Sequence, residues 1–454
     1  MRSGFTDLLR GLLDRPLASY YLLLSSSALL LTIGLVMVFS ATMVESYRAT
    51  GSATTIILQQ AIWAVVGLVC FWIAQRLPSR TYRAVSRPLL VVSMILGLIL
   101  VVMSIRESQQ DPNDSSGIAS DQLWIHLGPV QFQPAEIAKF ALLLWAADSL
   151  VRLGPRIASW RDLAIPMFPI AGLLMIVIGY ADLGTMLIIV AMFIGLLWAS
   201  GVPLRILAVL LGTAMTGSAL LIAFEGYRME RIISFSRPED YADTWGYQAI
   251  QGYYAIADGG WFGLGLGESR QKWEWLPNGH NDFIFALIAE ELGVVGCLVI
   301  LALFGVLVYT GFRIARRSDD PFRSLVAAGV TIWLAGQAFI NIGGVLGLIP
   351  MTGVPLPFIS DGGTALVVVL AAIGMLAGFA RAEPDAAQAL RARNPSRLVR
   401  LLWAPLPPAP SPVAPPSGDA SVASPRTGGS SAPADLHAES DSEVPKSRPT
   451  TRKT

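Results

Sequence analysis

The sequence predicts an all-α integral membrane protein with ten transmembrane helices, and three observations support this class. The chain of 454 residues is 53% hydrophobic and only 14% charged, whereas soluble domains carry about 25% charged residues. Its mean hydropathy is +0.56. Its apolar residues gather in long runs that are nearly free of charge. These properties argue against a soluble enzyme and favour one large membrane domain.

Charge and cysteine content narrow the class of protein further. The net charge is +1 and no basic cluster is interleaved with aromatic residues, so no nucleic-acid partner is expected. The two cysteines, Cys70 and Cys297, both lie inside apolar runs. They are typical of small buried hydrophobic residues rather than of a disulfide or a metal site.

Ten apolar runs are long enough to cross a bilayer, which requires about 17–25 residues. The first run is not followed by a small-residue cleavage site and is too long for the core of a signal peptide, so it is expected to stay as an anchor. The predicted spans are 20–40, 56–75, 89–105, 135–151, 164–180, 184–200, 206–224, 283–312, 324–346 and 362–380.

The charges of the loops predict the orientation of these spans. With a cytoplasmic N-terminus, the short segments on the inner side hold 15 Lys and Arg in 60 residues, and the short loops on the outer side hold two in 62. This asymmetry follows the positive-inside rule. Both termini are therefore expected in the cytoplasm, and 225–282 is one large extracytoplasmic loop between the seventh and eighth spans.

Three segments follow from this topology. Residues 1–19 form a cytoplasmic N-terminal segment, 20–381 the ten-helix membrane domain, and 382–454 a cytoplasmic tail rich in Pro, Ser and Ala. Within the tail, 401–454 alone contain 11 of the 29 prolines. Such a composition buries too little apolar surface to offset chain entropy, so the tail is predicted to be disordered. It is either a solvated end or a tether for cytoplasmic partners.

Few charges remain inside the predicted spans, and such charges are usually functional or paired. Glu136 and Lys139 are spaced i,i+3, so they share a helix face and can neutralise each other. They form either a buried ion pair that fixes helix packing or a charged wall beside a substrate cavity. Asp148 is expected to reach the cytoplasmic interface.

The eighth span begins with the segment LPNGHNDFIFALIAEELG. Asp282 directly precedes its apolar run, so it is either the N-cap of a helix or a carboxylate at the extracytoplasmic surface beside His280. Glu290 and Glu291 follow further along this helix. Adjacent residues point about 100° apart, so at least one of these two carboxylates is expected to be a packing or capping partner.

The large loop carries further candidates. Arg228 and Arg231 lie one helical turn apart and suit either a phosphate or lipid head group or ordinary interfacial anchoring. The stretch 245–256 is aromatic and amphipathic, which predicts a helix on the membrane. The run GGWFGLGLG (259–267) lacks the G-x-G-x-x-G pattern of a nucleotide loop, and its glycines are interpreted as permitting tight loop packing.

The last extracytoplasmic loop, 347–363, is dense in Pro and Gly. An irregular segment at membrane depth is tolerated only where it is buried in protein or lines a cavity, so this loop is expected to belong to the site. The chain has only three histidines, His126, His280 and His437, which excludes a His-rich metal site.

Four motifs resemble the signatures of the SEDS family, named for shape, elongation, division and sporulation. They are WIHLGPVQFQPAEIAKF (124–140), ADLGTML (181–187), LPNGHNDFIFALIAEELGVVG (276–296) and NIGGVLGLIPMTGVPLPFISDGGTAL (341–366). The resemblance extends over nearly the whole membrane domain. HNDFIF and KWEWLPN look more like the division members of the family than its elongation members.

The resemblance implies a ten-helix peptidoglycan glycosyltransferase that polymerises lipid II at the outer face of the inner (cytoplasmic) membrane, at the division septum. It places the essential carboxylate on Asp282, with Glu136, Lys139 and Trp124 at the matched positions of the family. Further substrate-binding candidates are Arg228, Arg231, His280 and Ser360. The implied partners are a class B penicillin-binding protein of the FtsI type, which is a transpeptidase, and other divisome proteins.

The chain departs from the family pattern in three places. The segment SDQLW (120–124) lacks the usual arginines, PFISDGG places Asp361 where an aromatic or small residue is common, and Tyr180 and Ala181 replace the usual residues before DLGT.

The residues support a mechanism in which one base takes the proton of the acceptor 4-hydroxyl group as it attacks the donor anomeric carbon. Asp282 is the hypothesised base. The leaving group, undecaprenyl pyrophosphate, needs no acid catalyst when a cation accompanies it. The resemblance to other lipid-pyrophosphate transferases implies a divalent cation, Mg²⁺ or Mn²⁺, to which no ligands are assigned. The alternatives are a lipid II flippase or scramblase and a non-catalytic scaffold. The concentration of polar residues at one membrane face favours chemistry there.

Overall fold

In the computed structural model, the described residues are 11, 13–110, 124–127, 130–223, 226–244, 246–273, 275–393, 396 and 405–406. The prediction of a disordered tail is wrong for its first residues, because Pro384–Ala392 form a helix. Beyond 393, nearly all of the tail falls outside the described residues. The same holds for most of 1–19 and for the stretch just before Trp124.

Each of the ten predicted spans coincides with a helix. Eight of these helices are long and apolar enough to cross a membrane, judged by length and composition over the described residues. They are α2 (Ala18–Thr50), α3 (Thr55–Ala74), α4 (Ser79–Gln110), α6 (Trp160–Ala181), α8 (Leu204–Ala223), α11 (Ile284–Arg317), α12 (Pro321–Val345) and α13 (Gly363–Arg381). The other two are α5 (Pro134–Leu153), which contains four charged residues, and α7 (Leu183–Ala199), which has only 17 residues. That α5 and α7 also cross the membrane stays a prediction.

The connections contain shorter elements. Strands β1 (Ile125–Leu127) and β2 (Val130–Phe132) pair antiparallel, with Ile125 opposite Phe132. The large loop holds α9 (Gly226–Ser236), the 3₁₀ turn η3 (Pro238–Tyr241) and α10 (Tyr247–Gly259), so the helix predicted within 245–256 is present. The remaining elements are the 3₁₀ turn η2 (Gly154–Ala158) and α14 (Pro384–Ala392).

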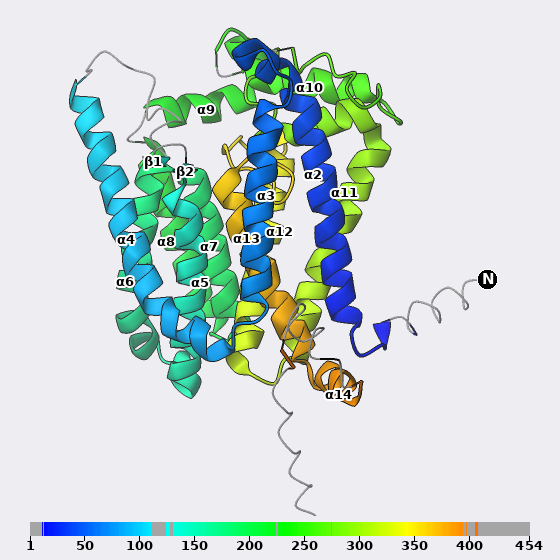
Figure 1. Ribbon diagram of the computed structural model, residues 1–454. Coiled ribbons are helices and arrows are strands. Elements are labelled where there is room, and N and C mark those ends of the chain that lie inside the picture. The colour runs from blue at the N-terminus through cyan, green and yellow to red at the C-terminus, as the bar shows by residue number, and fades with distance from the viewer. Residues whose placement is uncertain are drawn as a thin grey trace, which may run out of the picture. The chain divides into compact units, whose positions relative to one another are not determined.

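The ends of the bundle differ in what they carry. The beginning of α2 and helix α14 lie at one end, and α9 runs across the opposite end (Figure 1). At the first end Arg313, near the end of α11, donates through Nε to Ser19 Oγ at 3.0 Å. The loop helices therefore gather at the end that the charge pattern predicts to be extracytoplasmic.

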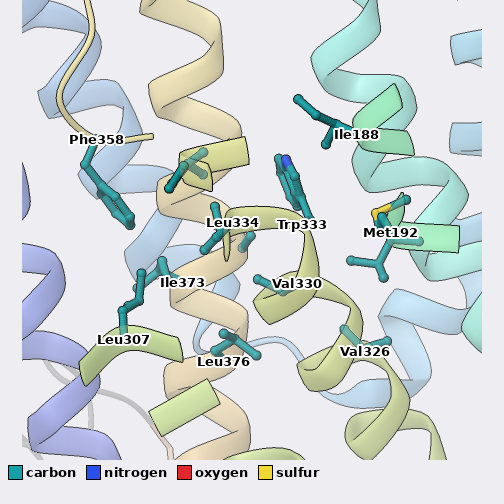
Figure 2. Close-up of a cluster of buried hydrophobic side chains, with 14 of the residues drawn as sticks. Ile188, Met192, Leu307, Val326, Val330, Trp333, Leu334, Phe358, Ile373 and Leu376 are labelled. Atoms are coloured by element: carbon teal, nitrogen blue, oxygen red, sulfur yellow. The ribbon is translucent and has the colours of Figure 1, made fainter. Parts of the chain in front are cut away.

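Helices α12 and α13 are the central elements. In each of them 67% of the most apolar window is buried inside the protein, compared with 17% in α3 and α8. Trp333 is fully buried and lies among side chains from α7, α12 and α13, with Phe358 from the segment between α12 and α13 in the same cluster (Figure 2). The exposed apolar faces of α3 and α8 are those expected of helices that face lipid.

Candidate active site

The four motifs meet around the irregular segment 346–362 between α12 and α13. A Cβ atom on Gly184, at the start of α7, would contact Thr352 and Val354, and one on Gly34 of α2 would contact the main chain of Phe358 and Ile359. From the segment before α5, Gln133 N donates to Thr364 Oγ1 at 3.2 Å. Glycine at 34 and 184 therefore permits an approach that a larger residue would block.

The second half of the segment is buried, whereas the first half stays open, with Leu346 and Leu348 43% and 68% exposed. The burial predicted from its Pro and Gly content therefore holds for the second half only. Val354, Leu356, Phe358 and Ile359 are at most 3% exposed. Phe358 has a φ of 68°, a left-handed conformation that costs energy for a bulky residue. A hydroxyl group stabilises this turn, since Leu356 N donates to Ser360 Oγ at 2.7 Å. The irregular backbone is thus held in one conformation by its surroundings.

Asp282 lies in the turn that precedes α11 and is half-buried. Phe283, and not Asp282, is the N-cap residue of α11, and it makes no side-chain capping bond. The main-chain carbonyl of Asp282 accepts from Asn341 Nδ2 at 2.9 Å, and the same amide group donates to Val354 O at 2.8 Å. Asn341 of α12 therefore joins the turn to the buried segment.

The Asp282 carboxylate faces the glycine of that segment. A Cβ atom on Gly353 would stand 3.5 Å from Asp282 Oδ2, and the φ of Gly353 is 73°. This φ would strain any side chain at position 353, whose Cβ atom would lie in van der Waals contact with the carboxylate. The turn thus presents a half-buried carboxylate on a backbone that Asn341 holds, an arrangement that suits a general base.

His280 lies beside two further carboxylates. Its Nδ1 is 3.4 Å from Glu45 Oε2 of α2, and its main-chain carbonyl accepts from Asp361 N at 3.1 Å. Burial raises the pKa of the Asp361 carboxyl above its ordinary value, the charge of His280 lowers that pKa, and the charge of Glu45 raises it. The unusual Asp361 thus shares an electrostatic environment with a predicted site residue.

Ser360, a predicted substrate-binding residue, is only 5% exposed. Its hydroxyl group accepts from Leu356 N and donates to Asn281 O at 2.6 Å. In this structure Ser360 therefore links the segment to the turn that carries Asp282.

Glu136 and Lys139 are paired as their spacing predicted. Lys139 Nζ is 2.7 Å from Glu136 Oε1, and the two side chains are 0% and 1% exposed respectively. Lys139 also donates to Gln337 Oε1 at 3.0 Å, and Gln337 Nε2 donates to Pro355 O at 2.9 Å. Both charges are enclosed by protein, which is the arrangement of a buried ion pair, although Glu136 Oε2 has no hydrogen-bond partner among the described residues. A role of the pair beside a substrate cavity stays a prediction.

The other charges in the predicted spans also have partners. Glu290 accepts from Ser269 Oγ at 2.5 Å, and Glu291 accepts from Ser40 Oγ at 2.6 Å. Both are therefore packing partners, as expected of at least one. Asp148 is buried and pairs with Arg152 at 2.8 Å.

Three predicted site residues lie apart from these contacts. Trp124 is half-buried just before β1. Arg228 and Arg231 lie on α9, three positions apart, and their side chains fall outside what the structure describes. Their proposed contact with a phosphate or lipid head group stays a prediction.

Three residues that make these contacts, Asn341, Gln337 and Glu45, were not predicted from the sequence. Asn341 and Gln337 are amides four residues apart in an otherwise apolar span, a spacing that puts them on one helix face. Polar side chains within spans commonly bond to neighbouring segments, so this spacing was the available signal. Glu45 follows the first apolar run and gave no such signal.

Comparison with known proteins decides the family. A sequence profile for the cell cycle protein family of FtsW, RodA and SpoVE matches residues 20–384. The chain belongs to this family. It is 42% identical over 396 residues to the probable peptidoglycan glycosyltransferase FtsW of Mycobacterium tuberculosis, covering 87% of this chain and 74% of that one. It is 36% identical over 361 residues to the stage V sporulation protein E of Bacillus subtilis, covering 79% and 96%.

Solved structures of the FtsW, RodA and SpoVE family share the fold. A chain of a peptidoglycan synthase complex that coordinates polymerization and crosslinking matches with a TM-score of 0.63 and 26% identity, over 79% of this chain and 96% of that one. The rod shape determining protein RodA of Thermus thermophilus matches with a TM-score of 0.58 and 26% identity, over 80% and 96%. The SEDS resemblance seen in the motifs is thus confirmed.

Proposed function

We propose that this protein is a peptidoglycan glycosyltransferase that polymerises lipid II at the outer face of the cytoplasmic membrane. Relatives named as such transferases support the activity, and the FtsW name of the Mycobacterium tuberculosis relative supports a role in division. The observation that carries the proposal is Asp282, a half-buried carboxylate on a turn held by Asn341 where the four motifs meet.

In the proposed reaction, the 4-hydroxyl oxygen of the acceptor sugar attacks the anomeric carbon of the donor, and Asp282 accepts the proton of that hydroxyl group. The bond from that carbon to undecaprenyl pyrophosphate breaks in the same step, and the anomeric configuration inverts. The side chain of Asn341 donates a hydrogen bond to the main-chain carbonyl of Asp282 and so holds the turn that carries the carboxylate. Gly353 leaves room beside that carboxylate. Pyrophosphate departs as a stable anion, so a second carboxylate acid is not required.

The divalent cation is not assigned a step in this mechanism. In the described part of the chain, no group of three or more His, Cys, Asp or Glu side chains could hold a metal ion. Mg²⁺ or Mn²⁺ therefore stays a component to be varied in the assay.

The finer topology and the setting belong to the same proposal. Ten spans, cytoplasmic termini and a septal location are supported by the loop charges, by the ten helices at the predicted positions and by the FtsW relatives. A class B penicillin-binding protein is the proposed partner. The similar solved chain belongs to a peptidoglycan synthase complex that coordinates polymerization and crosslinking, and crosslinking is the reaction of a transpeptidase.

The decisive experiment measures glycan chains formed from lipid II by the purified protein, with and without its transpeptidase partner. Asp282→Asn should lower polymerisation by about 10²–10⁴-fold, the usual contribution of a general base, and should retain lipid II binding. Asp243→Asn, an exposed acid of the same loop, is the control and should polymerise normally. Full polymerisation by Asp282→Asn would refute the assignment, and transport of labelled lipid II across proteoliposomes without polymer would favour the flippase.

A further inference from the structure

Helix α11 is broken inside its length. Gly293 has φ 67° and ψ −168°, so the helical hydrogen bonds are interrupted there. A break leaves carbonyl groups of the first half and N–H groups of the second half without helical partners. These groups need partners elsewhere in the protein.

The glycine-rich run 259–267 supplies those partners. Val294 N and Val295 N donate to Gly260 O and Trp261 O at 3.0 and 3.2 Å. In the opposite direction, Leu264 N and Gly265 N donate to Glu290 O and Glu291 O at 2.9 and 3.1 Å. The run therefore caps both halves of the broken helix at once, and we call residues 259–267 the capping loop.

The capping loop is fixed in place by close packing and by two carboxylates. Cβ atoms on Gly259 and Gly263 would collide with the main chain of α11, which explains the glycines. The Glu290 carboxylate accepts from Ser269 Oγ and from Arg270 N at 2.8 Å, just after the loop. Glu291 accepts from Ser40 Oγ and so holds the break against α2.

This rigid loop presents apolar side chains outward. Trp261 is 70% exposed, Phe262 84% and Leu266 57%. Exposed apolar clusters of this kind mark an interaction surface. The cluster continues the exposed face of α11, because the loop bonds directly to Val294 and Val295, and that face runs on to Leu298, which is 56% exposed.

The position of the break along two helices indicates what covers the cluster. The 24 residues of α11 after Gly293 would extend about 36 Å as helix, enough to cross the ~30 Å hydrocarbon core. The break therefore lies near one edge of that core. Ser40, its contact on α2, is the last residue of the apolar run 20–40, which ends at the same level. Aromatic side chains are favoured in this interfacial zone.

We propose that Trp261, Phe262 and Leu266 form a lipid-binding surface that enters the interfacial region of the outer leaflet. The partner is the glycerol and upper acyl region of membrane lipid, continuous with the lipid that surrounds α11. The surface anchors the first half of α11, and with it the turn before Ile284, at a fixed depth. This proposal stands independently of the catalytic role of Asp282.

The test places a spin label at Phe262. Phe262→Cys is made in the full chain with Cys70→Ala and Cys297→Ala, and the labelled protein is reconstituted in liposomes. Leu298→Cys on the exposed face of α11 is the lipid reference, and Thr244→Cys on the exposed part of the large loop is the water reference. Collision rates of the label with oxygen and with a water-soluble nickel chelate are then measured.

The expected ratio of oxygen to nickel accessibility at position 262 is close to that of Leu298→Cys and several-fold above that of Thr244→Cys. A ratio equal to that of Thr244→Cys would overturn the proposal. So would an immobilised label that neither reagent reaches, since that would indicate a protein contact. Leu266→Cys provides the same test if Phe262→Cys does not fold.

Discussion

Helix α12 contacts two charged regions, one around Lys139 and one around Asp282, and the side chains of the two regions differ in exposure. Around Lys139, every charge is enclosed, with side chains 0% and 1% exposed. Around Asp282, the charges stay partly open, since His280 and Glu45 are 25% and 49% exposed. An enclosed charge that is paired with an opposite charge contributes to assembly, whereas a partly open carboxylate can exchange a proton with a substrate.

Helix α12 connects the two regions. Trp333, Gln337 and Asn341 follow each other at intervals of four and so share one face. Trp333 Nε1 donates to Gln337 Oε1 at 2.8 Å, Gln337 accepts from Lys139, and Asn341 donates to the Asp282 carbonyl. The enclosed region around Lys139 therefore supports the same face of α12 that, through Asn341, positions the turn carrying Asp282.

Breaking the enclosed pair should have the largest effect on stability. Lys139→Met leaves the Glu136 carboxylate buried without its cation, which costs about 3–5 kcal/mol. The double variant Glu136→Gln with Lys139→Met removes both charges and should recover most of that loss. Unfolding of the purified protein in detergent measures both effects.

The exposed pair of Arg237 and Asp240, at 3.9 Å, provides the control. Arg237→Met should change stability by no more than about 1 kcal/mol. If Lys139→Met kept full stability and instead lost affinity for lipid II, Lys139 would belong to the wall of a substrate cavity and the comparison of the two regions would be wrong.

Loosening the link between the regions should have an intermediate effect. Asn341→Leu leaves the carbonyl oxygens of Asp282 and Val354 without their donor, which costs about 1–3 kcal/mol. Because the turn then moves, kcat should fall by up to about 100-fold with little change in KM. Gln337→Leu, which contacts Lys139 and Pro355 but not Asp282, should lose similar stability and much less kcat. Equal losses of kcat in both variants would show that Asn341 has no specific effect on the turn.

Much of this arrangement could be predicted from the sequence, for identifiable reasons. The spans follow from apolar length, which is why each predicted span coincides with a helix. The pairing of Glu136 with Lys139 follows from their spacing alone. The break at Gly293 could not be predicted, because a single glycine is tolerated within helices and the capping contacts come from residues about 30 positions earlier. Glu45 was missed because its role depends on a contact with His280, which is distant in sequence.

The smallest effect concerns the unusual carboxyl group of the open region. Burial raises the pKa of Asp361 above its ordinary value of 3.8, and so does Glu45, while His280 opposes this shift. A raised pKa means that the folded chain binds the proton more tightly, so this group favours folding below the ordinary pKa and that contribution is lost as pH rises through the raised pKa. Asp361→Asn removes the charge, so its Tm should exceed that of the parent protein at pH 8 by more than at pH 5. In Glu45→Gln, which removes one cause of the shift, the benefit of Asp361→Asn at pH 8 should shrink. A Tm difference that is the same at pH 5 and pH 8 would contradict this prediction. It would mean that the Asp361 carboxyl group does not titrate between these pH values in the folded chain, so its surroundings do not disfavour the charged form there.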